Sequence, residues 1–294
     1  MRQHLTAVLA AAEVCGGRVE GAHVGSTELT FTPDEVKAGS YEFSVGTAGS
    51  ATLVFQTVLP ALLQVAGDSR LVLRGGTHNP MAPPYHFLER AYIPQLRKMG
   101  AEVTLTLSRH GFYPAGGGEF VAEIHPVKVL KPLELTARGE RVAGYAESLI
   151  AGVARHVAKR ELDAVALAMS WKDDQLRIRG LPVDQGPGNA LMVTLEHEHV
   201  TEVVTAFGEK STSAESVAKK AIGAIREYTM STAAVGEHLA DQLLVPMALA
   251  GKGDMTVTTF SSHAATNAEV IQKFLTVEIE VGPVGDGAML VTIR

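Results

Sequence analysis

The chain has 294 residues, of which 46% are hydrophobic and 20% are charged, as is typical of a globular protein with one large domain or two smaller ones. Its 26 basic and 32 acidic residues give a net charge of −6, which argues against a protein that coats nucleic acid along its length. Cys15 is the only cysteine, so we expect no disulfide-linked partner, no cysteine-based zinc site and a cytoplasmic location. No apolar run approaches the ~20 residues that span a bilayer, so we also expect no membrane contact.

The first half of the chain predicts an opening helix, two short strands and then the order βαβαββ. Apolar residues at helical spacing predict the helices, and alternation of polar and apolar residues predicts the strands. The expected elements are a helix over 4–14, strands over 18–24 and 28–31, a strand over 41–45, a helix over 50–65, a strand over 70–73, a helix over 83–99, and strands over 102–107 and 119–124.

The same order recurs near the C-terminus, where it is interrupted once. The expected elements are a strand over 132–137, a helix over 233–249 that Pro246 must bend or shorten, a strand over 255–259, a helix over 266–274, and strands over 277–281 and 288–293. About 90 extra residues follow the first of these strands, and they carry a pattern of their own. That pattern consists of a strand near Arg141, a helix over 153–169, strands over 175–179, 190–197 and 200–207, and a helix over 214–228.

These patterns predict an α+β (α/β) fold of repeated βαβαββ units with an inserted domain. Residues 1–139 and 232–294 form the expected main domain, and residues 140–231 form a smaller inserted α+β domain. The opening helix and two strands match the last half of a further unit, so the first unit is incomplete. We therefore expect that a complete three-unit fold has roughly 40 more residues before the start of this chain.

Two glycine-containing segments follow predicted strands. The segment 110–118 carries three consecutive glycines, which suit either a glycine-rich hairpin or a close approach to a ligand. The segment 74–84 leads into a helix after two prolines, where Arg74 and free backbone N–H groups are suited to a phosphate. A loop with a helix-starting proline explains the second segment equally well.

Polar residues on two predicted helices are candidates for ligand contact. His238, Asp241 and Gln242 are spaced i, i+3 and i+4 and therefore share one helix face, which is either a nucleotide-binding face or an ordinary solvated one. Gln56 follows a Gly-Thr-Ala-Gly-Ser segment that is not a P-loop, because the Gly-Lys-Ser/Thr ending is missing.

Two further histidine motifs have alternative explanations. Thr266 and Glu269 have the spacing of a capping box, which places His263 between a strand end and a helix N-terminus that favours phosphate. A neutral imidazole there can attack phosphorus, whereas the simpler alternative is a surface-loop histidine. His197 and His199 share one side of a predicted strand and suggest either a metal site or, more simply, an exposed strand.

Taken together, segments 74–84, 110–118, 238–242 and 262–267 resemble the bacterial type of RNA 3'-terminal phosphate cyclase over essentially the whole chain. The run His-Gly-Phe-Tyr-Pro-Ala-Gly-Gly-Gly over 110–118 matches the family signature and is its most specific part. The family fold has three βαβαββ units and a smaller inserted domain, which agrees with the predicted elements.

The resemblance implies a ligase that uses ATP and an RNA with a 3'-phosphate end, and a role in RNA processing. In the family a histidine attacks the α-phosphorus of ATP, releases pyrophosphate and holds AMP. AMP then passes to the RNA 3'-phosphate, and the 2'-hydroxyl closes a 2',3'-cyclic phosphate. Mg²⁺ or Mn²⁺ is expected to help pyrophosphate leave.

The resemblance assigns roles to individual residues of this chain. The adenylylated histidine is His263, and the expected ATP contacts are Gln56, His238, Leu239, Ala240, Asp241 and Gln242. No protein metal ligand is assigned. Weaker candidates for the RNA end are Arg74, Arg90, Arg109 and His110.

One departure from the family pattern leaves alternative functions open. The family's Gly-Glu-Gly-Gly-Gly-Gln segment is absent from this sequence, so a late start or a truncated form without activity is expected. A truncated or non-catalytic cyclase-like RNA-binding protein is the second hypothesis. A sugar enolpyruvyl transferase, whose fold also repeats βαβαββ units, ranks last because it has no need of His263.

Overall fold

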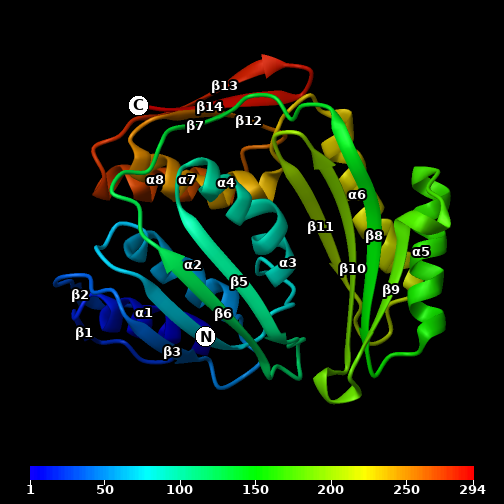
Figure 1. Cartoon of the computed structure of the whole chain (residues 1–294), viewed down its shortest axis with the longest axis horizontal. Coiled ribbons are helices and arrows are strands. Elements are labelled where there is room, and N and C mark those ends of the chain that lie inside the picture. Colours follow the sequence, from blue (N-terminus) through cyan, green and yellow to red (C-terminus); the bar gives the residue numbers. More distant parts are fainter.

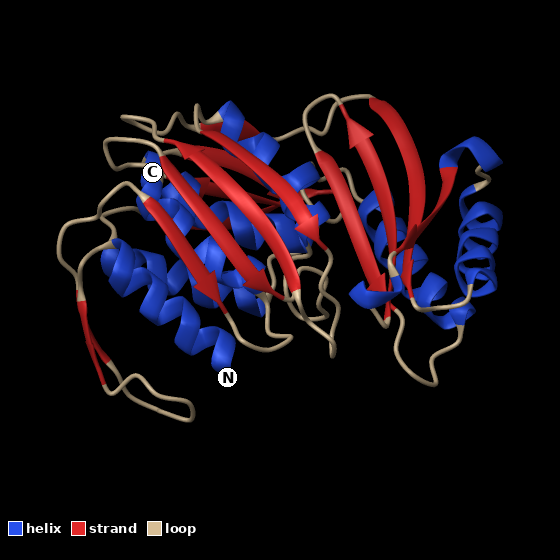
Figure 2. Ribbon diagram, turned by 60° about the horizontal axis from the view of Figure 1, so that its bottom comes forward, coloured by secondary structure: helices blue, strands red, loops and turns tan.

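The computed structural model describes residues 1–294 (Figures 1 and 2). One of its sheets has four strands in the order β3-β4-β6-β5, with bounds Ser40–Ser44, Ser69–Gly75, Gly118–His125 and Glu102–Arg109. β3 and β4 are parallel, whereas β6 pairs antiparallel with both β4 and β5. Helix α2 (Ala51–Leu62) links β3 to β4, and a helical segment links β4 to β5. These elements form one complete βαβαββ unit.

A second sheet repeats this strand arrangement. β7 (Leu133–Leu135) is parallel to β12 (Gly253–Val257), and β14 (Ala288–Ile293) pairs antiparallel with both β12 and β13 (Ile279–Gly285). Helices α7 and α8, over Glu237–Ala250 and Ser262–Phe274, precede and follow β12. Both sheets therefore have the strand order first, second, fourth, third, which confirms the predicted repeat of βαβαββ units.

The chain opens with the helix and strand pair expected for part of a further unit. α1 (Arg2–Val14) is followed by β1 (Arg18–Glu20) and β2 (Thr30–Thr32), which pair antiparallel as a separate two-stranded sheet. Ala10 and Val14 of α1 are buried in the main core, so this part of the chain is packed onto the first complete unit.

The main hydrophobic core lies between the two repeated sheets. Figure 1 shows α2, α7 and α8 between the β3–β6 sheet and the sheet that contains β7 and β12–β14. A single cluster of 46 buried apolar residues includes side chains from both sheets and from α2, α7 and α8. Burial of this apolar surface is the main force that holds the two units together. None of the helices has the length and apolar character needed to cross a bilayer.

A third four-stranded sheet interrupts the second unit between β7 and α7. Its strands have the order β11-β10-β8-β9, with bounds Thr201–Phe207, Gly188–His197, Arg141–Ala151 and Leu176–Leu181. Helices α5 (Arg155–Met169) and α6 (Ala214–Met230) cover its outer face (Figure 2). Twelve buried apolar residues form a second core there. The insertion thus has the predicted place and elements, while the domain boundaries at 140 and 231 stay predictions.

Two predicted helices differ from the structure for identifiable reasons. The segment expected as one helix over 83–99 consists of α3 (Tyr85–Phe87), the π-helical turn η1 (Leu88–Tyr92) and α4 (Ile93–Lys98). Pro94 has no N–H to donate to the carbonyl one turn earlier, at the point where the helix widens.

The helix predicted over 233–249 begins later, at Glu237. Its expected first turn is extended, because the Val235 N–H donates to the Thr256 carbonyl and the Val235 carbonyl accepts from the Thr258 N–H, each at 3.0 Å. The helix then continues through Pro246 to Ala250.

Candidate active site

Three helices bring five polar residues together around His263. Gln56 lies on α2, Asp241 and Gln242 on α7, and His263 and Asn267 on α8. The Gln56 side-chain amide donates to Gln242 Oε1, and Gln242 Nε2 donates to Asp241 Oδ2 at 3.4 Å. Asp241 Oδ2 also lies 3.3 Å from His263 Nδ1, and Asn267 Nδ2 donates to Asp241 Oδ1 at 3.1 Å. We refer to these five residues as the His263 cluster.

The imidazole of His263 is open to solvent, although one of its nitrogens faces a carboxylate. The His263 side chain is 87% exposed, whereas that of Asp241 is 15% exposed. Asn267 holds Asp241 through both its carboxylate and its backbone carbonyl, which fixes the carboxylate beside the ring. The contact at Nδ1 leaves Nε2 as the nitrogen that can meet a substrate.

Helix α8 begins earlier than the predicted capping box implies. Ser261 is its N-cap, and the Ser261 hydroxyl accepts a hydrogen bond from the Ala264 N–H at 3.2 Å. Thr266 donates its hydroxyl to the Ser262 carbonyl inside the helix, so Thr266 is not a cap. His263 therefore lies in the first turn of the helix, where N–H groups lack intrahelical partners and the dipole favours an anion.

The residues predicted on α7 divide between the site and the core. Asp241 and Gln242 belong to the His263 cluster, and His238 is exposed one turn earlier on the same helix. Leu239 and Ala240 are 0% exposed and lie in the main core, so they anchor the helix that presents the polar residues. ATP contact by these residues and by Gln56 stays a prediction.

The signature segment 110–118 is packed against the loop that follows β4. The Gly111 carbonyl accepts hydrogen bonds from the N–H groups of Thr77 and His78, at 2.8 and 2.9 Å, and the Gly111 N–H donates to Thr77 Oγ1 at 2.9 Å. A Cβ on Gly111 would lie 2.4 Å from the Gly118 nitrogen and 2.5 Å from the Gly75 carbonyl oxygen. Close approach of backbone segments therefore explains this glycine without a ligand.

Substitution of Gly111 by alanine is expected to lower the free energy of unfolding by about 3 kcal/mol, because backbone atoms must move to admit the methyl group. The matched control is Gly223→Ala on α6, where no atom lies within 4 Å of the added Cβ. That change is expected to raise the free energy by about 0.5–1 kcal/mol, since alanine favours the helix. Urea unfolding of both variants checks the prediction, which fails if Gly111→Ala is as stable as Gly223→Ala.

All four weaker candidates for the RNA end have partners within the protein. The Arg74 guanidinium contacts Glu42 and Glu119, at 2.8 and 2.6 Å, and the Arg109 guanidinium contacts Asp184 at 2.5 Å. Arg90 contacts the fully buried Glu147, also at 2.5 Å, and lies 3.8 Å from Glu89, while the His110 ring is 3.0 Å from Gln185 Oε1. These side chains can bind RNA only through nitrogens that these contacts leave free, or by exchanging a protein partner for a phosphate.

A buried carboxyl group from the inserted sheet supports the start of α7. Glu202 on β11 is 4% exposed, and its Oε2 accepts a hydrogen bond at 3.1 Å from the N–H of Gly236, the N-cap of α7. Burial raises the pKa of Glu202 to about 7, although Arg138 and the Gly236 hydrogen bond oppose the rise. Glu202 is not among the predicted site residues, because only the tertiary structure brings β11 to α7.

Glu202 is expected to make the protein less stable as the pH rises from about 4.5 to 7. In that window the unfolded chain releases the Glu202 proton while the folded protein retains it, so up to about 3 kcal/mol of stability is lost. The Glu202→Gln variant should therefore gain in melting temperature over the wild type between pH 5 and pH 8. Glu227→Gln, on the exposed side of α6, is the control and should show no such gain. Equal pH dependence in wild type and Glu202→Gln contradicts the prediction.

Asn267 is the other site residue that had no predicted role. The spacing of the two residues could have indicated its role. Asn267 follows His263 by four residues, so the two side chains share one face of any helix that begins before His263. The helix expected over 266–274 begins after His263, so the predicted elements concealed that relation.

Comparison with known proteins identifies relatives over almost the whole chain. The family model for "RNA 3'-terminal phosphate cyclase" matches residues 1–281 of this chain. An RNA 3'-terminal phosphate cyclase from Koribacter versatilis is 51% identical over 281 residues, which cover 96% of this chain and 79% of that protein. One from Pseudomonas fluorescens is 50% identical over 291 residues, which cover 99% of this chain and 85% of that protein. The chain belongs to the RNA 3'-terminal phosphate cyclase family.

Proposed function

We propose that this protein is an ATP-dependent ligase that converts an RNA 3'-phosphate into a 2',3'-cyclic phosphate through AMP bound to His263. One observation carries the proposal, namely the exposed His263 imidazole whose Nδ1 lies 3.3 Å from the Asp241 carboxylate in the first turn of a helix. Membership of the cyclase family supplies the reaction class and the RNA substrate.

In the first step, His263 Nε2 attacks the α-phosphorus of ATP. An N–P bond forms, the bond from the α-phosphorus to the bridging oxygen breaks, and pyrophosphate leaves with the electron pair. The imidazole ring becomes positively charged as the N–P bond forms, and the carboxylate of Asp241 next to Nδ1 stabilises that charge. The unpaired N–H groups at the start of α8 favour the phosphate oxygens.

In the second step, an oxygen of the RNA 3'-phosphate attacks the phosphorus of the bound AMP. The N–P bond breaks, His263 regains a neutral ring, and an anhydride joins AMP to the RNA 3'-phosphate. The 2'-hydroxyl then attacks the RNA phosphorus and loses its proton, AMP leaves, and the cyclic phosphate closes. The ATP energy is thus stored on the protein before RNA reacts.

The proposed ATP site extends from His263 along α7 to α2. Gln56, His238, Asp241 and Gln242 offer polar atoms for the nucleotide, while Leu239 and Ala240 hold the helix in place. Asp241 is the only carboxylate in the His263 cluster, and both of its oxygens have protein partners. We therefore propose that Mg²⁺ or Mn²⁺ arrives as part of the nucleotide substrate, because such ions are commonly held by substrate phosphates. A cytoplasmic location completes the proposal and is supported by the free, buried Cys15.

Incubation of the full chain with ATP labelled at the α-phosphate and Mg²⁺ or Mn²⁺, without RNA, tests the proposal. We expect label on the protein that is acid-labile and alkali-stable, as a phosphoramidate is. Peptide mass spectrometry should place AMP on His263. Addition of an RNA with a 3'-phosphate should then release the label as AMP and yield a 2',3'-cyclic end. Failure of the wild-type chain to take up label contradicts the proposal, as does label on another residue.

ATP labelled at the γ-phosphate is the matched control. Pyrophosphate carries that label away, so the protein should stay unlabelled. This outcome separates AMP transfer from phosphorylation, and it distinguishes the proposed ligase from an RNA-binding relative without catalysis, which takes up neither label.

A further inference from the structure

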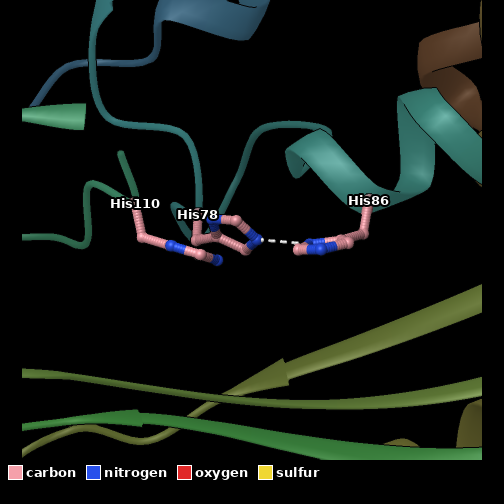
Figure 3. A group of neighbouring side chains, drawn as sticks. All are labelled: His78, His86 and His110. Atoms are coloured by element: carbon pink, nitrogen blue, oxygen red, sulfur yellow. Dashed lines mark hydrogen bonds between the residues drawn. The ribbon is translucent and has the colours of Figure 1, made fainter. Parts of the chain in front are cut away.

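Three histidines from separate parts of the chain, none of them in the His263 cluster, meet next to the inserted sheet. His78 follows β4, His86 lies on α3 and His110 follows β5. One ring nitrogen from each lies within 4.8 Å of one from each of the others (Figure 3). His78 and His86 are 0% and 6% exposed. The approach of three imidazoles at this depth is unexplained by the proposed reaction at His263.

Hydrogen bonds orient two of the rings so that a nitrogen points toward the third. His110 Nδ1 lies 3.0 Å from Gln185 Oε1, an amide oxygen that only accepts, so Nδ1 carries the proton and Nε2 keeps a lone pair. His78 Nδ1 lies 2.9 Å from the Thr77 hydroxyl, which leaves its Nε2 to face His86 Nδ1 at 2.8 Å. Fixing one ring nitrogen so that the other points at a shared position is the arrangement by which proteins orient metal-binding histidines.

The three rings are held in the neutral form that binds metals. Burial lowers the pKa of all three, with His86 reaching about 3 and His78 well below its ordinary value. Two guanidinium groups nearby, those of Arg90 and Arg179, would repel a cation. Both contact the buried Glu147 carboxylate, at 2.5 and 2.6 Å, which offsets one of the two positive charges, and Glu89 lies 3.8 Å from Arg90.

We propose that His78, His86 and His110 bind one divalent transition-metal ion of the zinc class, with nitrogen ligands from all three. Imidazole suits Zn²⁺, and three histidines leave a fourth position for water. Without the ion, His78 carries its proton on Nδ1, toward the Thr77 hydroxyl, and His86 donates from Nδ1 to His78 Nε2. When the ion binds, His86 loses the proton from Nδ1 and takes one up on Nε2, so that each of the three neutral rings presents a lone pair to the metal.

The site would tie the signature loop to the inserted sheet. Gln185, which orients His110, lies in the turn between β9 and β10, and Asp184 next to it contacts Arg109. Figure 3 shows the strands of the inserted segment passing beside the three rings. A bound ion would therefore stabilise the contact between the two parts of the protein.

Zn²⁺ titration of the full chain, first freed of metal with a chelator and kept without nucleotide, tests the site. We expect one Zn²⁺ per chain by calorimetry and a Zn²⁺-dependent rise in melting temperature. Replacement of Zn²⁺ by Co²⁺ should give the visible absorption of a four-coordinate ion. His110→Gln and His86→Ala should each weaken Zn²⁺ binding at least about 100-fold and abolish the rise in melting temperature. His156→Ala, an exposed histidine on α5, is the matched control and should bind as the wild type does.

Other outcomes overturn the proposal. Circular dichroism first establishes that each variant folds, and His110→Gln, which alters the least buried of the three rings, keeps the test informative if His86→Ala does not fold. Zn²⁺ binding that is equal in the wild type and in His110→Gln contradicts a three-histidine site. A histidine-dependent rise in melting temperature with inorganic phosphate but not with Zn²⁺ assigns the cluster to an anion instead.

Discussion

Replacement of His263 by alanine is expected to reduce AMP transfer from labelled ATP to background, a loss of about 10⁴-fold or more. The substitution removes the only nitrogen that forms the proposed bond to phosphorus, and no other side chain of the His263 cluster can replace it. Gln56, Gln242 and Asn267 are amides, and Asp241 has both oxygens in contact with protein partners. Single-turnover labelling followed by acid and alkali treatment measures the loss.

The fold should be unaffected by this change. The His263 side chain is 87% exposed, so its removal is expected to alter the free energy of unfolding by no more than about 0.5 kcal/mol. His156→Ala serves as the control because it also removes an exposed histidine from a helix, and it should label as the wild type does. A His263→Ala protein that still takes up label would show that the nucleophile has been misassigned.

Substitution of Asp241 by asparagine is expected to slow AMP transfer about 10²-fold. Asparagine keeps the size of the side chain and its contact with Asn267, but it carries no charge to stabilise the ring as the N–P bond forms. The amide can also turn its NH₂ group toward His263 Nδ1, which favours the tautomer with the proton on the attacking nitrogen. Single-turnover labelling at saturating ATP measures the chemical step apart from ATP binding.

Two comparisons define the result for Asp241. Asn267→Ala removes a hydrogen bond to Asp241 Oδ1 while leaving the carboxylate charge in place, so its loss in rate should be smaller, about tenfold. Asp163→Asn, on the exposed face of α5 where it pairs with Lys159, should leave the rate unchanged. An Asp241→Asn protein that labels at the wild-type rate contradicts the proposed role of this carboxylate.

The order of helices and strands was predictable from sequence because local periodicity determines it. The predicted strand over 288–293 has the observed bounds of β14, and the predicted helix over 214–228 is two residues shorter than α6. The spacing of apolar residues indicates which face of a helix or strand is buried, even when the element that packs against that face is unknown. The repeated βαβαββ order was visible for the same reason.

Helix starts were less predictable because several residues can cap a helix. Thr266 and Glu269 have capping-box spacing, yet Ser261 is the residue that accepts the hydrogen bond from the first turn of α8. The end of β12 determines where the chain turns into this helix, and the turn selects the cap. This difference moved His263 into the helix and brought Asn267 onto the same face.

The contacts of the candidate site depended on long-range packing. Helical spacing places His238, Asp241 and Gln242 on one face. Only the tertiary arrangement of α2, α7 and α8 joins Gln242 to Gln56, 186 residues away, and Asp241 to His263. The same holds for the histidines. The sequence suggested His197 and His199, which are neighbours on one strand, whereas the tertiary structure brings His78, His86 and His110 together from two loops and a helix. The periodicity of the sequence shows only which residues are neighbours within one helix or strand. Which helices and strands contact one another depends on how their buried faces pack.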